Sequence, residues 1–303
     1  MKIKIKNNPP LITIFTPAYN RRNLLPRLYT SLKNQTSKNF VWLIIDDGSV
    51  DGTEKWVEDI KQEDTIDVKY IKKTNGGKHT AYNLACQVAD TELFFIAMDS
   101  DDQLTSKAVE EIEKCWEKCK NDKEIEGMVF LCEDPSGKML YSYYDTIQLN
   151  KNPSWKAAYV NGWFWGEAEY ILRTTYAREF LYPEYDNEKF FNEAYTYMQM
   201  DGKLVWNKRS IYIRDYQKEG LTNNFLKSVF KSPLGYADYN KIRMNIVKNK
   251  KLLIKAVLFY DIFSILGKRK HIVKEASVQW LSTLMLPLSV VIALILKIKF
   301  RGC

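Results

Sequence analysis

The sequence predicts an α/β protein with a mostly parallel, Rossmann-like sheet that is flanked by helices. Short apolar runs rich in β-branched and aromatic residues alternate with segments of helical spacing from residue 11 to residue 120, which is the pattern of repeated βαβ units. The chain has 303 residues, 46% of them apolar, enough to bury the core of a large domain. Two apolar runs, 41–45 and 93–98, lead directly into acidic clusters. Because the carboxyl ends of parallel strands meet at one crevice, these acids are expected to face a common ligand.

The individual elements follow from the periodicity of the chain. The first apolar run, 11–15, is followed by a helix that Asn20 is expected to cap and that has leucines four residues apart. Later apolar runs with strand character are 41–45, 68–71, 93–98 and 128–131. Segments with apolar residues three or four apart, and hence predicted helices, are 51–60, 80–89, 106–120 and 189–200. Two short runs, 204–206 and 211–213, predict a final pair of strands.

The positive charge of the chain is concentrated in its last fifth. Residues 241–303 hold 13 Lys and Arg against two acids, a net charge of +11, which leaves 32 basic and 35 acidic residues, or −3, in residues 1–240. A basic tail with aliphatic stretches suits an anionic membrane surface, because each charge gains about 1 kcal/mol near anionic lipid. We therefore expect a membrane partner for the tail and no nucleic acid.

One segment of the tail, 276–296, has no charged residue, and its strongly apolar part, 280–296, is 17 residues long. That length is at the lower limit for spanning a hydrocarbon core of ~30 Å. Basic residues flank both ends, whereas a spanning helix usually has asymmetric positive charge. This favours anchoring in the membrane plane or as a re-entrant segment over a single pass, and a buried helix that closes the core is a further alternative.

The cysteines and the amino terminus indicate a cytoplasmic location. The five cysteines contain no CxxC pair, which indicates reduced thiols rather than a disulfide framework or a zinc site. The first eight residues alternate charged and apolar side chains and do not resemble a secretory signal. We expect the protein at the cytoplasmic face of the membrane, either peripheral or with a single C-terminal anchor.

The acidic clusters have the residue types that bind metal ions and sugars. In Asp99-Ser100-Asp101 two carboxylates are one residue apart after a strand, so they can bind a hard divalent cation and a hydroxyl group together. A helix-capping turn is an alternative explanation for this cluster. Asp46 and Asp47, which precede Gly48-Ser49, can likewise be explained as a type I turn.

The order of these motifs is more informative than any one of them. Residues 16–21 (TPAYNR), 45–53 (IDDGSVDGT), 75–78 (NGGK) and 99–102 (DSDD) follow four successive predicted strands. In this order the chain strongly resembles the inverting family-2 glycosyltransferases of bacterial cell-surface glycan synthesis, whose nucleotide-sugar domain has the GT-A fold. The resemblance implies a GT-A domain over residues 1–224, with a donor half at about 9–120 and an acceptor half at about 121–224. Residues 225–303 then form the basic helical tail.

The resemblance also implies roles for the residues of the donor half. Asp47 would bond the base imide, Lys78 would reach the base or the phosphates, and Asp101 would hold the Mn²⁺ or Mg²⁺ that neutralises the diphosphate. Asp99 would contact the ribose or the donor sugar. The remaining residues that would contact the nucleotide sugar are Pro17, Ala18, Tyr19 and Ser100.

The acceptor half needs a general base, because the acceptor hydroxyl must lose its proton as the nucleoside diphosphate leaves. The position of the base in the family matches Glu193 best, and Glu188 is the alternative. Trp165 and Glu167 are candidate acceptor contacts, and Lys218 lies where related enzymes close a loop over the diphosphate.

The resemblance implies a metal-dependent, inverting transfer of one sugar from a nucleotide-diphosphate sugar to a glycan or lipid-linked acceptor, with a uridine diphosphate sugar as the expected donor. The Gln-x-x-Arg-Trp signature of processive family members is missing, which favours transfer of a single sugar. A non-catalytic nucleotide-sugar-binding or scaffold protein of the same fold is the alternative function. A nucleotidyltransferase is disfavoured, because residues 16–21 lack the glycines that usually open its nucleotide loop.

Overall fold

The computed structural model describes residues 9–215 and 225–299, and it confirms the predicted α/β class. An eight-stranded sheet has the strand order β3-β2-β1-β4-β9-β6-β10-β5. Its first half is a parallel set whose members are β1 (Ile12–Ala18), β2 (Phe40–Asp46), β3 (Asp67–Lys72) and β4 (Leu93–Phe95). The acidic clusters follow β2 and β4, so both lie at the carboxyl edge of this parallel set.

The second half of the sheet mixes strand directions. Its strands are β5 (Gln103–Leu104), β6 (Ile125–Glu133), β9 (Ala168–Arg173) and β10 (Lys203–Ile213). β9 runs antiparallel to β4 on one side and to β6 on the other, and β10 pairs parallel with β6. A separate two-stranded ribbon pairs β7 (Tyr141–Tyr144) with β8 (Phe164–Gly166).

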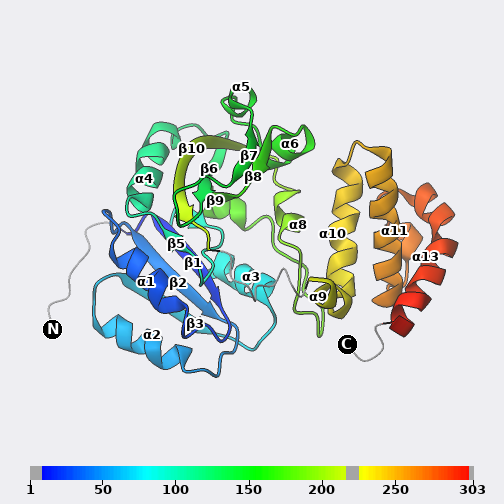
Figure 1. Ribbon diagram of the computed structural model, residues 1–303, viewed down its shortest axis with the longest axis horizontal. Coiled ribbons are helices and arrows are strands. Elements are labelled where there is room, and N and C mark those ends of the chain that lie inside the picture. The colour runs from blue at the N-terminus through cyan, green and yellow to red at the C-terminus, as the bar shows by residue number, and fades with distance from the viewer. Residues whose placement is uncertain (1–8, 216–224, 300–303) are drawn as a thin grey trace.

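Helices cover both faces of the sheet (Figure 1). One apolar core joins the sheet to α1 (Leu25–Lys33), α2 (Thr53–Gln62) and α4 (Ala108–Cys119), while α3 (Lys78–Val88) belongs to a second core on the other face. Side chains alternate along a strand, so Ile14 of β1 lies in the first core and Phe15 packs against Tyr82 of α3 in the second. Short helices in the second half are α5 (Thr146–Leu149), α6 (Trp155–Val160), α7 (Thr174–Ala177) and α8 (Ala194–Tyr197).

The tail is helical, as expected, and lies at one end of the molecule (Figure 1). Its helices are α9 (Phe225–Lys231), α10 (Pro233–Ile246), α11 (Lys250–Leu266), α12 (Ile272–Glu275) and α13 (Gln279–Lys299). They share a third apolar core that includes Val257, Tyr260 and Leu281. A polar contact ties this bundle to the sheet domain, since the Tyr185 hydroxyl donates to Asp238 at 2.5 Å; within the bundle Arg269 pairs with the same carboxylate at 2.6 Å.

Three local expectations were wrong. Asn20 does not cap α1; it has a φ of 53°, and its side chain accepts a hydrogen bond from the Val50 amide instead. The predicted helix over 189–200 is only the four-residue α8, because the Phe190 amide bonds the Ser232 hydroxyl and the chain stays irregular before Ala194. The two runs at 204–206 and 211–213 are parts of one strand, β10, whose register with β6 shifts between Asn207 and Ser210.

Candidate active site

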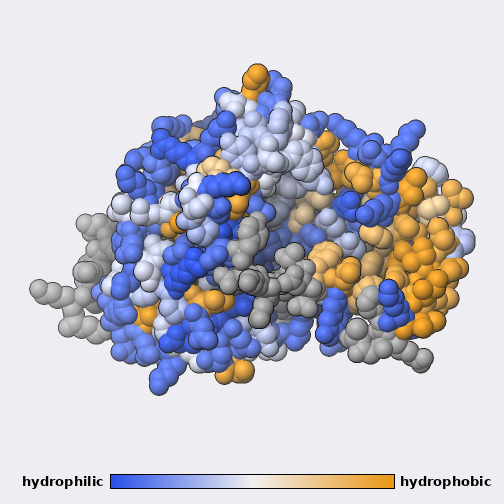
Figure 2. Space-filling view, viewed as in Figure 1, coloured by the Kyte–Doolittle hydropathy of each residue, from blue (hydrophilic) through white to orange (hydrophobic). Residues whose placement is uncertain are grey.

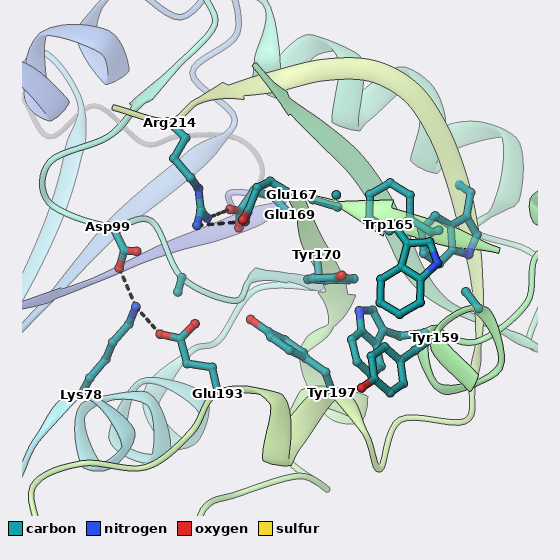
Figure 3. Close-up of a pocket in the computed structure, with 17 residues that line it drawn as sticks. Lys78, Asp99, Tyr159, Trp165, Glu167, Glu169, Tyr170, Glu193, Tyr197 and Arg214 are labelled. Carbon is teal, nitrogen blue, oxygen red and sulfur yellow. Dashed lines mark hydrogen bonds and ion pairs between the residues drawn. The ribbon is translucent and has the colours of Figure 1, made fainter. Parts of the chain in front are cut away.

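A cavity of about 260 Å³ lies at the carboxyl edge of the sheet, between the two halves of the domain. One end is charged and the other is aromatic (Figure 3). The charged side chains that line it are Lys78, Asp99, Glu167, Glu169, Glu193 and Arg214. The aromatic side chains that line it are Trp155, Tyr159, Phe164, Trp165, Tyr170, Tyr197 and Trp206.

Lys78 joins the two halves of the site. It is the first residue of α3, and its Nζ lies 2.6 Å from Asp99 Oδ1 and 2.6 Å from Glu193 Oε1. Burial acts to lower the pKa of Lys78, but the two carboxylates raise it above its ordinary value. Burial likewise opposes ionisation of Asp99, but Lys78 and Arg214 hold the pKa of that carboxyl below its usual range. The sequence therefore places a fixed ammonium between two acids that are 94 residues apart in the chain.

A second ion-pair cluster lines the same end of the cavity. Arg214, just after β10, reaches Glu167 Oε2 at 3.1 Å and Glu169 Oε1 at 2.8 Å. Burial raises the pKa of Glu169 to about 8, although the nearby guanidinium opposes the shift. Glu169 and Arg214 were not among the predicted site residues. An acid inside the otherwise uncharged run 168–172 was the signal that could have identified Glu169, since a lone buried carboxylate in a strand needs a partner.

Asp47 organises the glycine loop. Its carboxylate accepts hydrogen bonds from the Gly76 amide at 2.8 Å, the Gly77 amide at 2.6 Å and Lys73 Nζ at 2.7 Å. Gly77 has a φ of +98°, and a Cβ at this position would lie 2.1 Å from the Lys189 carbonyl oxygen. The loop therefore needs glycine for both its conformation and its close approach to the segment that leads to Glu193.

The other predicted donor-side residues lie next to Asp47, outside the cavity described above. The Asp47 amide donates to the Ala18 carbonyl at 2.8 Å, so Pro17 and Ala18 at the end of β1 are adjacent to it. Tyr19 is half exposed. Asp46 bonds the Ser49 amide at 2.7 Å and the Tyr70 hydroxyl at 2.5 Å, which makes it a support for the turn.

The DxD cluster places its acids in different surroundings. Ser100 and Asp102 are buried, and Asp102 accepts from the Tyr212 hydroxyl at 2.7 Å and the Asp215 amide at 2.9 Å. Burial raises the pKa of Asp102 to about 6. Asp101 is partly exposed, and no hydrogen bond or ion pair engages its carboxylate within residues 9–215 and 225–299.

The donor chemistry of this cluster fits a hard divalent cation. Carboxylate oxygens are the ligands that Mg²⁺ and Mn²⁺ prefer, and Mg²⁺ is commonly held by one or two carboxylates together with substrate phosphates. The described part of the chain contains no group of three His, Cys, Asp or Glu side chains that could hold a metal by itself. Asp101, which retains its full acceptor capacity, is the residue whose chemistry best matches shared coordination with a phosphate.

Four predicted site residues remain, and they differ in their position relative to the cavity. Trp165, half exposed, and Glu167 both line the cavity. Glu188 does not line it; its two oxygens accept from the Leu234 and Gly235 amides at 2.8 Å each and so cap α10. The alternative of Glu188 as the base therefore has no support from its position. Lys218 lies outside the described residues.

The aromatic end of the cavity is a connected set of rings. Trp155 stacks on Tyr159 with ring centroids 5.0 Å apart, and Tyr159 meets Trp165 at 5.9 Å. Tyr170 and Tyr197 lie between these rings and the charged end, with centroids 4.9 Å apart. Flat apolar faces beside carboxylates can bind a sugar, because a pyranose has an apolar C–H face and a rim of hydroxyls.

Comparisons with known proteins identify relatives of this chain. Residues 13–130 match the family model "Glycosyl transferase family 2". The GalNAc(5)-diNAcBac-PP-undecaprenol beta-1,3-glucosyltransferase of Campylobacter jejuni is 24% identical over 263 residues, which cover 80% of this chain and 77% of that protein. Hyaluronan synthase of Pasteurella multocida is 34% identical over 149 residues, which cover 48% of this chain but only 15% of the synthase.

Solved structures of glycosyltransferases share the fold. Staphylococcus aureus TarS in complex with UDP-GlcNAc aligns with a TM-score of 0.58 and 16% identity, covering 89% of this chain and 77% of that one. The mannosyltransferase PcManGT from Pyrobaculum calidifontis, in complex with GDP-Man and Mn²⁺, aligns with a TM-score of 0.53 and 16% identity, covering 97% and 76%. These similarities identify the chain as a glycosyltransferase with a GT-A fold, in which residues 13–130 match glycosyl transferase family 2.

Proposed function

We propose that this glycosyltransferase moves a single sugar, with inversion, from a uridine diphosphate sugar to a glycan or lipid-linked glycan of the cell surface. The observation that carries the proposal is the contact of Lys78 with both Asp99 and Glu193. It brings the carboxylate expected to contact the donor close to a carboxylate from the acceptor half of the domain. A direct displacement needs a donor-binding group and a base in one site, and the base would have to act on the face of the reacting carbon opposite the leaving group.

The donor nucleotide would bind where β1 and β2 end, against Pro17, Ala18 and Tyr19. A carboxylate has about four acceptor positions, and Asp47 uses three of them within the glycine loop. One position is left for a further donor, which suits the single imide N–H of uracil. Asp99 and Ser100 would contact the ribose or the donor sugar.

Asp101 would hold Mn²⁺ or Mg²⁺ together with the diphosphate. When bound, the cation would supply positive charge that neutralises the leaving nucleoside diphosphate. Lys78 adds a fixed ammonium at the same end of the site. Because charge on the leaving group grows in the transition state, a cation held in place by Asp99 and Glu193 favours bond breaking.

Glu193 would accept the proton of the acceptor hydroxyl. Its side chain is half exposed and lines the cavity, while the ion pair with Lys78 restricts where its carboxylate can lie. The acceptor sugar would pack on the aromatic wall at Trp165, with Glu167 available for a hydroxyl group. The Campylobacter relative is named for an undecaprenol-linked glycan, which supports a lipid-linked acceptor here.

The test compares Glu193→Gln with Asp186→Asn, a matched carboxylate-to-amide change at an exposed position outside the cavity. Glu193→Gln should reduce metal-dependent transfer from a UDP-sugar by at least ~100-fold, the size typical of losing a general base. Donor binding measured by calorimetry should survive. Asp186→Asn should behave like the unmodified protein.

The alternative function, a non-catalytic nucleotide-sugar-binding or scaffold protein, gives a different result. No donor in a panel of nucleotide sugars would then yield diphosphate release with any acceptor, although calorimetry would still detect nucleotide-sugar binding. Full activity of Glu193→Gln would instead show that another group removes the proton.

A further inference from the structure

One face of α13 is an exposed apolar ridge. Its members recur every three or four residues, which places them on one side of a helix. The exposed fractions are 69% for Trp280, 64% for Leu284, 50% for Leu288, 54% for Val291, 58% for Ile295 and 73% for Ile298. Figure 2 shows hydrophobic side chains gathered at this end of the molecule, over α11 and α13. We call these six residues the α13 ridge; at a rise of about 1.5 Å per residue it is roughly 27 Å long.

The opposite face of α13 is fixed to the bundle. Ser282 and Ser289 are fully buried there, and both hydroxyls reach the buried carboxylate of Asp261 on α11, at 2.6 Å and 3.5 Å. α13 is long and apolar enough to cross a membrane by length and composition. To cross a bilayer alone, however, it would have to leave α11, and Asp261 would lose both partners in the interior of the bundle.

The charge around the ridge is positive. Lys270 and Lys274 are exposed shortly before α13 begins, and Lys297 and Lys299 are exposed at its end. The only acids of residues 241–303 are Asp261 and Glu275, and both are engaged, Asp261 with the serines and Glu275 with Arg269 at 2.8 Å. An apolar ridge with cations at both ends is complementary to a surface that is apolar inside and anionic at its rim.

We propose that α13 lies flat on an anionic lipid bilayer, with the α13 ridge in the outer acyl region and the helix still docked on α11. Amphipathic helices of this kind insert about 5–10 Å and are held by buried apolar area together with attraction to anionic lipid. A second copy of the chain is a less suitable partner for the ridge, because like-charged lysines would then face one another at its ends.

This orientation also fixes the height of the active site above the lipid. Lys248, in the turn between α10 and α11, donates to Asn161 Oδ1 at 2.9 Å, directly after α6 with its cavity residues Trp155 and Tyr159. The bundle therefore contacts the segment that directly follows α6, the helix that carries two residues of the aromatic wall. If the proposed function is right, a lipid-linked acceptor would meet this wall at a constant distance from the membrane; binding of the ridge to lipid does not depend on that function.

Vesicle flotation tests whether the α13 ridge binds lipid. The full chain should bind vesicles of phosphatidylcholine with 30% phosphatidylglycerol, used here as a probe composition, and bind pure phosphatidylcholine more weakly. A triple variant with Leu284→Gln, Leu288→Gln and Val291→Gln should bind at least roughly 100-fold more weakly. Each substitution removes an apolar side chain that would be buried in lipid on binding. Two exposed apolar residues remote from the tail serve as controls, Val50→Gln and Ile147→Gln, and should bind like the unmodified chain.

Nitroxide depth measurements separate a flat helix from a spanning one. Labelled cysteines would replace Trp280, Leu288 or Ile298 one at a time, in a background with Cys119→Ser and Cys303→Ser. Similar shallow depths at all three positions are expected. Position 288 near the bilayer centre with shallow ends would overturn the proposal in favour of a spanning helix.

Two further outcomes bear on the proposal. Concentration-dependent dimerisation without vesicle binding would overturn it, since the ridge would then be covered by a second copy. Glu193→Gln should bind vesicles like the unmodified chain, so that a failure of the proposed chemistry and a failure of the membrane surface are distinguishable. Unchanged thermal unfolding of the triple variant would show that its loss of binding is a surface effect.

Discussion

Lys78 Nζ lies 2.6 Å from Glu193 Oε1, which links the amino terminus of α3 to that of α8 across the cavity. The same nitrogen bonds Asp99, so one ammonium is shared by two carboxylates. Bringing two carboxylates this close without a cation between them would be unfavourable. The geometry of the whole site therefore depends on the charge of Lys78.

Lys78→Met should reduce transfer on the order of 100-fold, because it removes a fixed charge near the leaving group and leaves Asp99 and Glu193 to repel each other. Lys78→Arg should retain part of the activity. Steady-state transfer and donor calorimetry would measure both effects. The matched control is Lys72→Met, which breaks an exposed ion pair with Glu54 at 2.7 Å; Lys72 does not line the cavity. Equal activity of the Lys78 and Lys72 variants would rule out the electrostatic role.

Removal of divalent metal should abolish transfer, and added Mn²⁺ or Mg²⁺ should restore it, because the leaving diphosphate needs neutralisation. Asp101→Ala should not be rescued at metal concentrations that restore the unmodified protein. Calorimetry of donor binding with and without Mn²⁺ gives a readout besides activity. Asp59→Asn, at an exposed position on α2, is the control. Full transfer by Asp101→Ala with all metal chelated would contradict the predicted role.

Gly77→Ala should destabilise the fold by more than about 2 kcal/mol and impair transfer, since it combines an unfavourable φ with a severe clash. The new Cβ would lie 2.1 Å from the Lys189 carbonyl oxygen and would displace the segment that carries Glu193. Gly137→Ala isolates the effect of φ: Gly137 has a φ of +83° with nothing within 4 Å of its Cβ position. Gly137→Ala should lower the free energy of unfolding by about 1 kcal/mol. Urea unfolding of both variants checks the difference, and equal losses would contradict the clash.

The stability of the protein should fall in acid partly through His79. Burial lowers its pKa from 6.5 to about 4, and its ring packs against Phe191 and Tyr182. The unfolded chain takes up this proton below pH 6.5 and the folded chain only near pH 4. Neutral His79 therefore makes its full contribution to the free energy of unfolding above pH 6.5. As the pH falls towards 4, that free energy decreases by up to about 3 kcal/mol.

His79→Phe removes this titration and keeps an aromatic ring in the pocket. The free energy of unfolding measured by urea at pH 7 and pH 4.5 should therefore fall less for His79→Phe than for the unmodified protein. The buried acids Glu169 and Asp102 have raised pKa values, so they stabilise the fold as the pH falls. Their contribution to the free energy of unfolding is the same in both proteins and cancels in the comparison. Parallel losses in both proteins would contradict the role of His79.

The donor half of the fold could be predicted because its signals are local. A strand, the turn residues after it and the next helix are contiguous, so residues 45–53 and 75–78 identify their own position at the sheet edge. The pairing of Arg214 with Glu169 could not be predicted in this way, because 45 residues separate them and only the sheet order β9-β6-β10 makes them neighbours. The helix over 189–200 failed for a similar reason, since the apolar spacing of Phe190 and Phe191 reflects packing against other elements.

The place of β9 has a consequence for engineering. β9 comes from the acceptor half of the chain, yet it pairs with β4 of the donor half. A fragment that ended at residue 120 would leave the β4 edge open, with unpaired backbone groups that favour aggregation. The two halves are interleaved rather than modular. A chimera that exchanges acceptor preference between relatives would have to keep β9 with its original sheet and graft only the loops around it.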